Sequence, residues 1–318
     1  MATFHVTVAG GGDSSGDSKA NAFTLAEAIT DLATTTAGDI YLFYGDGGAF
    51  TGVANYTLSV DGSTTARITL RGVDASGNPA SGGDRPVFNM GTYYFYFTGD
   101  YYLAENLDLN GTASSGCILS GPGSHVRNCK VNNTSGTAGR PAIATLSTPA
   151  YIENNELISA QGNALDIGSS DYVNVMWNYC HDSEWGIDVT SGFITLAYNY
   201  IDTCDTAGLL IQSADNMTIN HNTIYGCPIG ISGTNPTNII IMNNQIEYGN
   251  TETGISFSTP HVTNIGDNNN YWESAGSGTD ATNFTKGPNA TAKTPGYADA
   301  PNGDFSGVDD FDARVIAF

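Results

Sequence analysis

Small and aliphatic residues recur in pairs at a nearly constant spacing over the middle of the chain. The aliphatic members of these pairs are Ile118, Ile143, Leu165, Ile187, Leu209, Ile231 and Ile255. The steps between them are 25, 22, 22, 22, 22 and 24 residues. Steps of this size indicate a solenoid, in which each repeat forms one coil that stacks on the next.

The apolar pattern within each repeat predicts strands rather than helices. Short runs such as VNVMWN (173–178) and ITLAYN (194–199) alternate or are β-branched, and Gly, Asn, Asp and Ser bound them. Such runs are typical of β-strands, and no ten-residue stretch of this region shows the 3.6-residue period of a helix. We therefore expect each coil to consist of three short strands joined by turns.

A second column of positions carries Asn, with an aliphatic residue three places earlier. Asn suits a tight corner because it tolerates left-handed backbone torsions and its amide bonds to nearby backbone. Coils stacked at about 4.8 Å would bring these amides within hydrogen-bonding distance of one another. In one repeat Cys129 replaces the Asn. The predicted ladder residues are Asn106, Asn155, Asn178, Asn199, Asn222, Asn244 and Asn268.

This double pattern resembles the right-handed parallel β-helix superfamily, the pectate-lyase-like fold that many phage tailspikes also use. The resemblance implies an all-β chain, a single-stranded right-handed parallel β-helix with rungs of about 22 residues. Thr24 and Glu27 form a capping box, which predicts a short helix that covers the N-terminal end. We expect one continuous domain, with the cap and first rungs at 1–84, the β-helix at 85–272 and a closing segment at 273–318.

The charge balance narrows the classes of partner. Among 318 residues, 32 are acidic and 10 are basic, a formal net charge of −22. A surface of this kind repels nucleic acid and anionic membranes, so neither is an expected partner. The first residues show no secretory signal, and no run reaches the ~18 apolar residues of a membrane span. Five cysteines without a CxxC pair argue against a disulfide framework or a zinc site.

Two acids occupy equivalent positions on adjacent rungs. The residue after the aliphatic one should point outward from its strand, and Asp166 and Asp188 hold this position, with Glu184 in the preceding turn. The resemblance implies that enzymes place catalytic residues on this face, so the three acids are candidates for glycosidase-like acid–base chemistry. The alternatives are a solvated polar face and a calcium site, since carboxylates bind Ca²⁺ without His or Cys. The sequence indicates no other metal or cofactor.

A lyase is disfavoured. Elimination from a uronate normally needs a base, often Lys or Arg in this superfamily, and positive charge to hold the sugar carboxylates. Between Pro141 and Thr285 the chain has no Lys or Arg.

Aromatic and imidazole side chains flank the Asn column, at Trp177, Tyr179, Tyr198, Tyr200 and His221. If they are exposed, they are candidates to stack on sugar rings or to anchor a protein partner. The alternative is that aromatic side chains simply pack well along parallel strands.

Together these features favour a non-catalytic structural or decoration protein of a phage-like virion surface, with glycans as an expected ligand. The alternatives are a polysaccharide hydrolase that uses Asp166 and Asp188, and a cell-surface adhesin. The expected location is a virion surface or the cell exterior. Virion or cell-surface proteins are the expected partners, and the resemblance leaves a homo-oligomer open.

Overall fold

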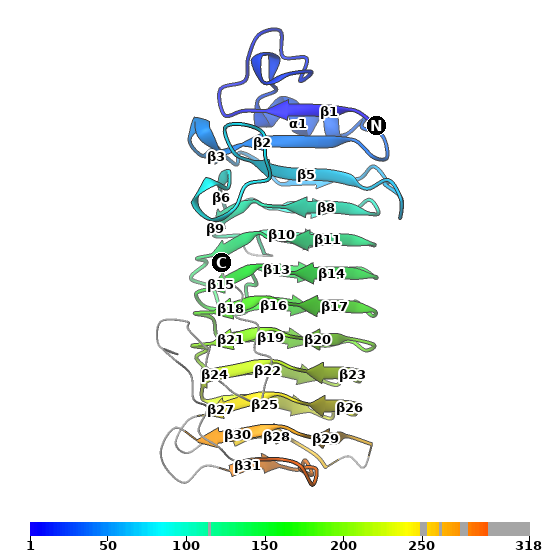
Figure 1. Cartoon of the computed structure of the whole chain (residues 1–318), viewed down its shortest axis with the longest axis vertical. Helices are drawn as coiled ribbons and strands as arrows, with labels where there is room; N and C mark the ends of the chain where they lie inside the picture. Colours follow the sequence, from blue (N-terminus) through cyan, green and yellow to red (C-terminus); the bar gives the residue numbers. More distant parts are fainter. Residues whose placement is uncertain (114–115, 249–252, 261–262, 274–278, 292–318) are drawn as a thin grey trace.

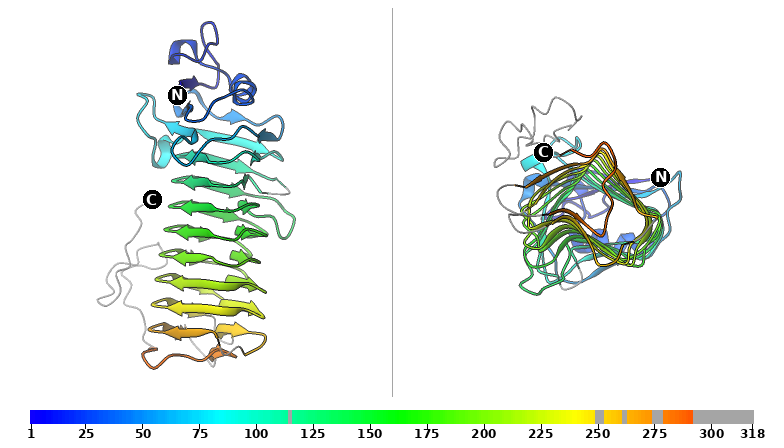
Figure 2. Two further views of the ribbon diagram at one scale, coloured as in Figure 1. Left: turned by 90° about the vertical axis from the view of Figure 1, so that its right-hand side faces the viewer. Right: turned by 90° about the horizontal axis from the view of Figure 1, so that it is seen from below.

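The computed structural model describes residues 1–113, 116–248, 253–260, 263–273 and 279–291. Its strands stack one above another along a single axis, and the coils overlie one another when viewed from the end (Figures 1 and 2). All pairings between consecutive coils are parallel, as in Val175 with Leu196 and Ile187 with Leu209. The predicted all-β parallel β-helix is therefore confirmed.

The described strands form three long sheets, here called A, B and C. Sheet A consists of β1 (Thr3–Val6), β2 (Ile40–Tyr44), β5 (Ile68–Val73), β8 (Tyr102–Glu105), β11 (Ser124–Arg127), β14 (Ala150–Glu153), β17 (Val173–Met176), β20 (Thr195–Ala197), β23 (Asp215–Asn220), β26 (Thr237–Met242) and β29 (Ile265–Asp267). Sheet B consists of β3 (Phe50–Thr51), β6 (Val87–Gly91), β9 (Asp108–Gly111), β12 (Lys130–Asn133), β15 (Glu156–Ser159), β18 (Tyr179–His181), β21 (Tyr200–Asp202), β24 (Thr223–Cys227), β27 (Gln245–Tyr248) and β30 (Asn270–Glu273). Sheet C consists of β4 (Tyr56–Leu58), β7 (Phe95–Phe97), β10 (Ile118–Ser120), β13 (Ile143–Thr145), β16 (Asn163–Ile167), β19 (Trp185–Val189), β22 (Ala207–Gln212), β25 (Ile229–Thr234), β28 (Thr253–Phe257) and β31 (Thr279–Thr282).

The repeated Gly-Ile pair has a packing reason. Each coil runs through sheets A, B and C in turn, and the Gly lies at the start of the sheet C strand, facing the interior. A Cβ atom added at Gly186, Gly208 or Gly230 would lie only 2.3–2.4 Å from the Cγ2 atom of an Ile on sheet B. The following Ile or Leu is fully buried, so two consecutive residues point inward and the first must be small.

The N-terminal end carries the predicted helix. Helix α1 (Leu25–Leu32) begins with the Thr24–Glu27 capping box and buries Leu25, Ala28 and Leu32 against the first coils (Figure 1). Three short 3-10 helices, η1 (Lys19–Asn21), η2 (Gly45–Gly47) and η3 (Gly82–Asp84), lie in the connections. No helix in the described part of the chain is long and apolar enough to span a membrane.

The first coils already belong to the three sheets before residue 85, and β31 continues sheet C beyond residue 272. Most of the expected closing segment, residues 292–318, lies outside the described residues. All five cysteines are buried and free in this structure.

Candidate functional site

The outer column of sheet C brings the two predicted acids together. Backbone register places Asp166 directly beside Asp188 on the next coil. The same column continues through residues that carry no charge, Leu119, Ala144, Leu210, Ser232 and Ser256. The spacing of the sequence repeats therefore predicts these neighbours correctly.

The two carboxylates have different partners. Asp188 is 9% exposed, and its two oxygens accept hydrogen bonds from Gln212 Nε2 at 3.0 and 3.1 Å. Asn163 Nδ2 donates a third bond to Asp188 at 3.2 Å. Asp166 is half-buried, and no side-chain hydrogen bond reaches it within the described residues. Protein hydrogen-bond donors therefore stabilise the carboxylate of Asp188, and no such side-chain donors stabilise that of Asp166 within the described residues.

This difference separates their ionisation. Burial and, as a smaller cause, the neighbouring Asp188 charge together raise the pKa of Asp166 to about 6. Burial also raises the pKa of Asp188, but the hydrogen bonds from Gln212 and Asn163 oppose that rise. Because these donors favour the charged form, Asp188 ionises first and Asp166 holds its proton to higher pH.

Asn163, Gln212 and Trp185 complete this part of the face, and sequence reasoning missed all three. Asn163 is 4% exposed, and its Oδ1 atom has no hydrogen-bond partner among the described residues. Trp185, half-buried, pairs in register with Asn163. A signal existed, because Asn163 and Trp185 each lie three residues before an Asp of the pair.

Glu184 lies in the turn before β19. Burial raises the pKa of its carboxyl, and the nearby Asp205 charge adds to that rise. Within the described residues, no hydrogen bond joins its carboxylate to Asp166 or Asp188. Its catalytic role therefore stays a prediction.

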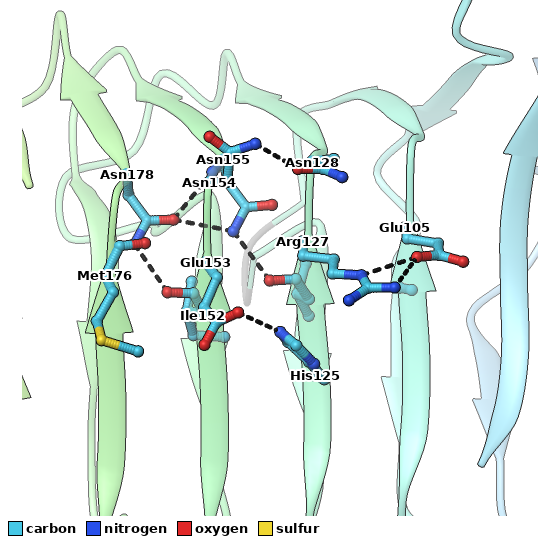
Figure 3. A network of polar contacts seen from close by, with 12 residues as sticks. Glu105, His125, Arg127, Asn128, Ile152, Glu153, Asn154, Asn155, Met176 and Asn178 are labelled. Atoms are coloured by element: carbon cyan, nitrogen blue, oxygen red, sulfur yellow. Dashed lines mark hydrogen bonds and ion pairs between the residues drawn. The ribbon is translucent and has the colours of Figure 1, made fainter. Parts of the chain in front are cut away.

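The Asn ladder lies inside the corner between sheets A and B. Each side-chain amide donates to the next amide oxygen, at 2.9 to 3.0 Å, and that oxygen also accepts a backbone N–H. Figure 3 shows its first step, between Asn155 and Asn178. The hydrogen-bonded members are Asn155, Asn178, Asn199, Asn222, Asn244 and Asn269.

The prediction was wrong at the two ends of the ladder. Asn268 lies one residue before the true member, Asn269, and it has the left-handed φ of 53° that the corner requires. Asn106 is in the same left-handed position, with φ 60°. The ladder position of that coil is therefore the next residue, Leu107, which is buried and has no side-chain amide.

The flanking aromatic residues form two columns. Trp177, Tyr198 and His221 occupy the left-handed position before a ladder Asn and stack face to face, with ring centroids 4.2 and 4.9 Å apart. Ring faces within this column are thus turned toward each other, which leaves mainly ring edges for a ligand. Tyr179 and Tyr200 lie on sheet B, 5.2 Å apart. A ligand-binding role for these five residues stays a prediction.

Basic side chains gather on the outer face of sheet A, away from the acid pair. Glu105 is buried and forms ion pairs with Arg71 and Arg127. Figure 3 shows its contact with Arg127, and that of His125 with Glu153 at 2.9 Å. Lys130 pairs with Glu156 on sheet B at 2.7 Å. In the part of the chain that the structure describes, no group of three or more His, Cys, Asp or Glu side chains could hold a metal ion. Calcium at the acid pair stays a prediction.

Comparison with known proteins supports the fold. Residues 96–292 match the sequence profile of a family described as a right handed beta helix region. No curated protein matches the sequence. Two solved structures align with most of the chain at 11% identity. Pectate lyase Pel9A has a TM-score of 0.59 over 95% of this chain and 84% of its own, and the lacto-N-biosidase of family GH136 from Eubacterium ramulus has 0.58 over 92% and 68%.

A phage protein shares the fold as well. Tailspike protein 2 from Escherichia coli O157:H7 bacteriophage CAB120 has a TM-score of 0.54 at 11% identity, over 85% of this chain. The present chain covers 39% of that tailspike. At such identities the likeness describes the fold alone.

Proposed function

The chain belongs to the right-handed β-helix family, and we propose that it is a polysaccharide hydrolase whose acid pair is Asp166 and Asp188. The observation that carries this proposal is the inequality of the two stacked carboxylates. Glycoside hydrolysis uses one protonated and one ionised carboxyl group on either side of the scissile bond. Here Asp188 has three hydrogen bonds that favour its charge, and Asp166 has a pKa of about 6.

Each residue then has a defined task. Asp166, protonated in weak acid, donates its proton to the leaving glycosidic oxygen. Asp188 acts as the anionic partner, either as the base for a water molecule or as the nucleophile, and the carboxyl separation decides which. Trp185, half-buried and in register with Asn163, offers an apolar surface beside the pair.

The charges around the pair favour hydrolysis over elimination. Arg71 and Arg127 are committed to Glu105 on sheet A, and Lys130 to Glu156 on sheet B. None of these lies on sheet C, where a lyase would need a base near the acid pair. A neutral glycan is therefore the better substrate class, because the carboxylate of a uronate would be repelled by the two carboxylates of the pair.

The test is incubation of the protein with a panel of neutral and acidic polysaccharides, following reducing ends and unsaturated products by ultraviolet absorbance. We expect new reducing ends without absorbance, and loss of this activity in Asp166→Asn and Asp188→Asn. The matched control is Asp84→Asn, an exposed acid in η3, which should keep full activity. Absorbance from unsaturated products, or full activity in both Asp variants, would overturn the proposal.

A second candidate is a non-catalytic, glycan-binding structural protein of a virion surface. The unbroken ladder of buried amides favours it, because a rod whose backbone and corner groups are bonded from coil to coil opens rarely to proteases. The outcome that would select this candidate is polysaccharide binding without cleavage, retained in Asp166→Asn and Asp188→Asn.

A further inference from the structure

One face of the rod lacks charge over four consecutive coils. It consists of the sheet A strands β17, β20, β23 without its first residue Asp215 and β26 without its first residue Thr237, together with neighbouring corner residues, and it spans 172–177, 193–198, 216–221 and 238–243. These 24 positions contain no Asp, Glu, Lys or Arg, in a chain with a net charge of −22. We call this face the neutral strip.

Charged residues mark the limits of the neutral strip. Glu153 on β14 and Asp267 on β29 occupy the next coils at either end. Along one edge lie Asp171, whose carboxylate accepts the Gly192 N–H at 3.0 Å, and Asp215, which accepts from Asn216 at 2.8 Å. The neutral strip is therefore a surface with defined limits, because charged residues lie at both of its ends and along one edge.

Large apolar side chains are exposed on the same face. Tyr172 and Phe193 are 58% and 48% exposed, and their rings stack 5.0 Å apart at one edge. Ile240 is 39% exposed and pairs in register with Ile265, just past the strip, which is 57% exposed. Four of the seven large hydrophobic residues exposed in the described part of the chain thus lie along one side of sheet A. Grouped exposure of this kind marks an interaction surface.

We propose that the neutral strip is the surface by which two copies of this chain associate. Each copy has a net charge of −22, so contacts between charged faces would be repulsive. The strip avoids this penalty, and a second copy presents the same uncharged surface with the same exposed apolar side chains. A twofold contact pairs a patch with itself, so a surface without charge is complementary to its own copy.

The dimensions indicate a weak association. Four coils at about 4.8 Å and six residues at about 3.3 Å give a flat area of about 400 Å² on each partner. Stable dimers bury about 800 Å² on each partner. We therefore expect a monomer–dimer equilibrium that depends on protein concentration rather than a permanent dimer.

The effect of salt on association distinguishes an apolar interface from one held by ion pairs. Added salt screens the repulsion between two acidic molecules, while the burial of apolar side chains does not depend on that screening. Association through the neutral strip should strengthen from about 0.15 M to about 1 M NaCl. An interface held by ion pairs would weaken instead.

The experiment is sedimentation velocity of the full chain over a wide concentration range at both salt levels. We expect the mass to rise from 33.2 kDa toward twice that value, more so at high salt. Ile240→Asp, which places a charge in the strip, should abolish the rise. Leu146→Asp is the matched control, because Leu146 is 43% exposed but lies outside the strip, and it should associate like the wild type.

Circular dichroism and thermal unfolding check that each variant is folded. If Ile240→Asp lowers stability, Thr218→Asp at an adjacent outward position gives the same test, since Thr218 pairs with Ile240 in register. A monomer under every condition would overturn the proposal, as would a folded strip variant that associates like the wild type. Neither result depends on glycan cleavage, which concerns sheet C.

Discussion

The Asn ladder and the acid pair are both columns of polar side chains, and each coil of the β-helix contributes one residue to a column. In the ladder, each Asn is an almost completely buried amide, and donors meet acceptors from coil to coil. In the acid pair, two carboxylates of like charge meet, and among the described residues only Asp188 has side-chain donors. The same stacking thus joins compatible groups in one column and opposed groups in the other.

This difference separates a column that stabilises the fold from one for which we propose a chemical role. A neutral amide carries both a donor and an acceptor, so a row of amides satisfies itself at any length. A carboxylate carries only acceptors, so a row of carboxylates needs outside donors or a retained proton. A half-buried carboxylate at Asp166, beside a second carboxylate, lowers the free energy of unfolding. We take this cost as evidence that Asp166 has a role other than stability.

The largest expected effect is in the ladder. Asn199→Ala removes the amide that bonds Asn178 and Asn222, together with its bond to Val175 O. Several buried polar groups lose their partners, so we expect a loss of at least about 3 kcal/mol in the free energy of unfolding, measured with urea. Asn174→Ala, an outward position on β17, is the control and should change stability by less than about 0.5 kcal/mol. Equal effects at the two sites would remove the distinction between buried and surface Asn.

The acid pair should respond in the opposite direction. Asp166→Asn removes a half-buried charge and its repulsion with Asp188, so we expect the variant to be more stable than the wild type near pH 7. The shift of the pKa from 3.8 to about 6 sets an upper limit of about 3 kcal/mol. Thermal or urea unfolding measures it, with Asp84→Asn as the neutral comparison. A destabilised Asp166→Asn would show that the charge supports the fold.

The pH dependence gives a third test with a definite sign. A carboxyl whose pKa is raised in the folded state binds a proton more tightly there than in the unfolded chain. The contribution of Asp166 to stability therefore falls as pH rises from about 4 to about 6, and is constant above that window. The stability difference between Asp166→Asn and the wild type should grow across this window. A difference that stays flat from pH 3 to pH 8 would contradict the raised pKa.

The smallest effect is expected at Gln212. Gln212→Ala removes two hydrogen bonds that favour the charged form of Asp188, so the pKa of Asp188 should rise. Because Gln212 is exposed, we expect a stability change within about 1 kcal/mol near pH 7. If the protein hydrolyses glycans, the acid limb of its kcat/KM profile should move to higher pH. An unmoved limb would mean that Gln212 does not influence the anionic partner.

Residue columns that repeat once per coil can be predicted from the sequence. Equal spacing fixes which residues stack, so the Asp166–Asp188 contact and most of the ladder could be derived from residue numbers alone. Asn268–Asn270 are three consecutive asparagines, and spacing cannot choose among them. The left-handed torsion at Asn268 makes that choice, because the ladder residue follows it.

Contacts that cross between columns could not be predicted in this way. Asn163 and Gln212 reach Asp188 from other coils and other columns, so no periodicity links them. The sequence also could not decide whether Trp177 and Tyr198 stack on each other or present their rings to solvent, because side-chain direction at a corner depends on torsions that composition does not specify. The sequence thus indicates where a polar pair lies, and the structure is needed to show which member holds the proton.

The most direct test of that inequality is a pH titration of the Asp166 and Asp188 carboxyl carbons by NMR, in the wild type and in Asp188→Asn. We predict that the pair titrates in two coupled steps, with the later step near pH 6 and mainly on Asp166. In Asp188→Asn, the pKa of Asp166 should fall because the neighbouring charge is gone. Two independent titrations near the ordinary value of 3.8 would contradict a strained acid pair and, with it, the proposed catalytic role.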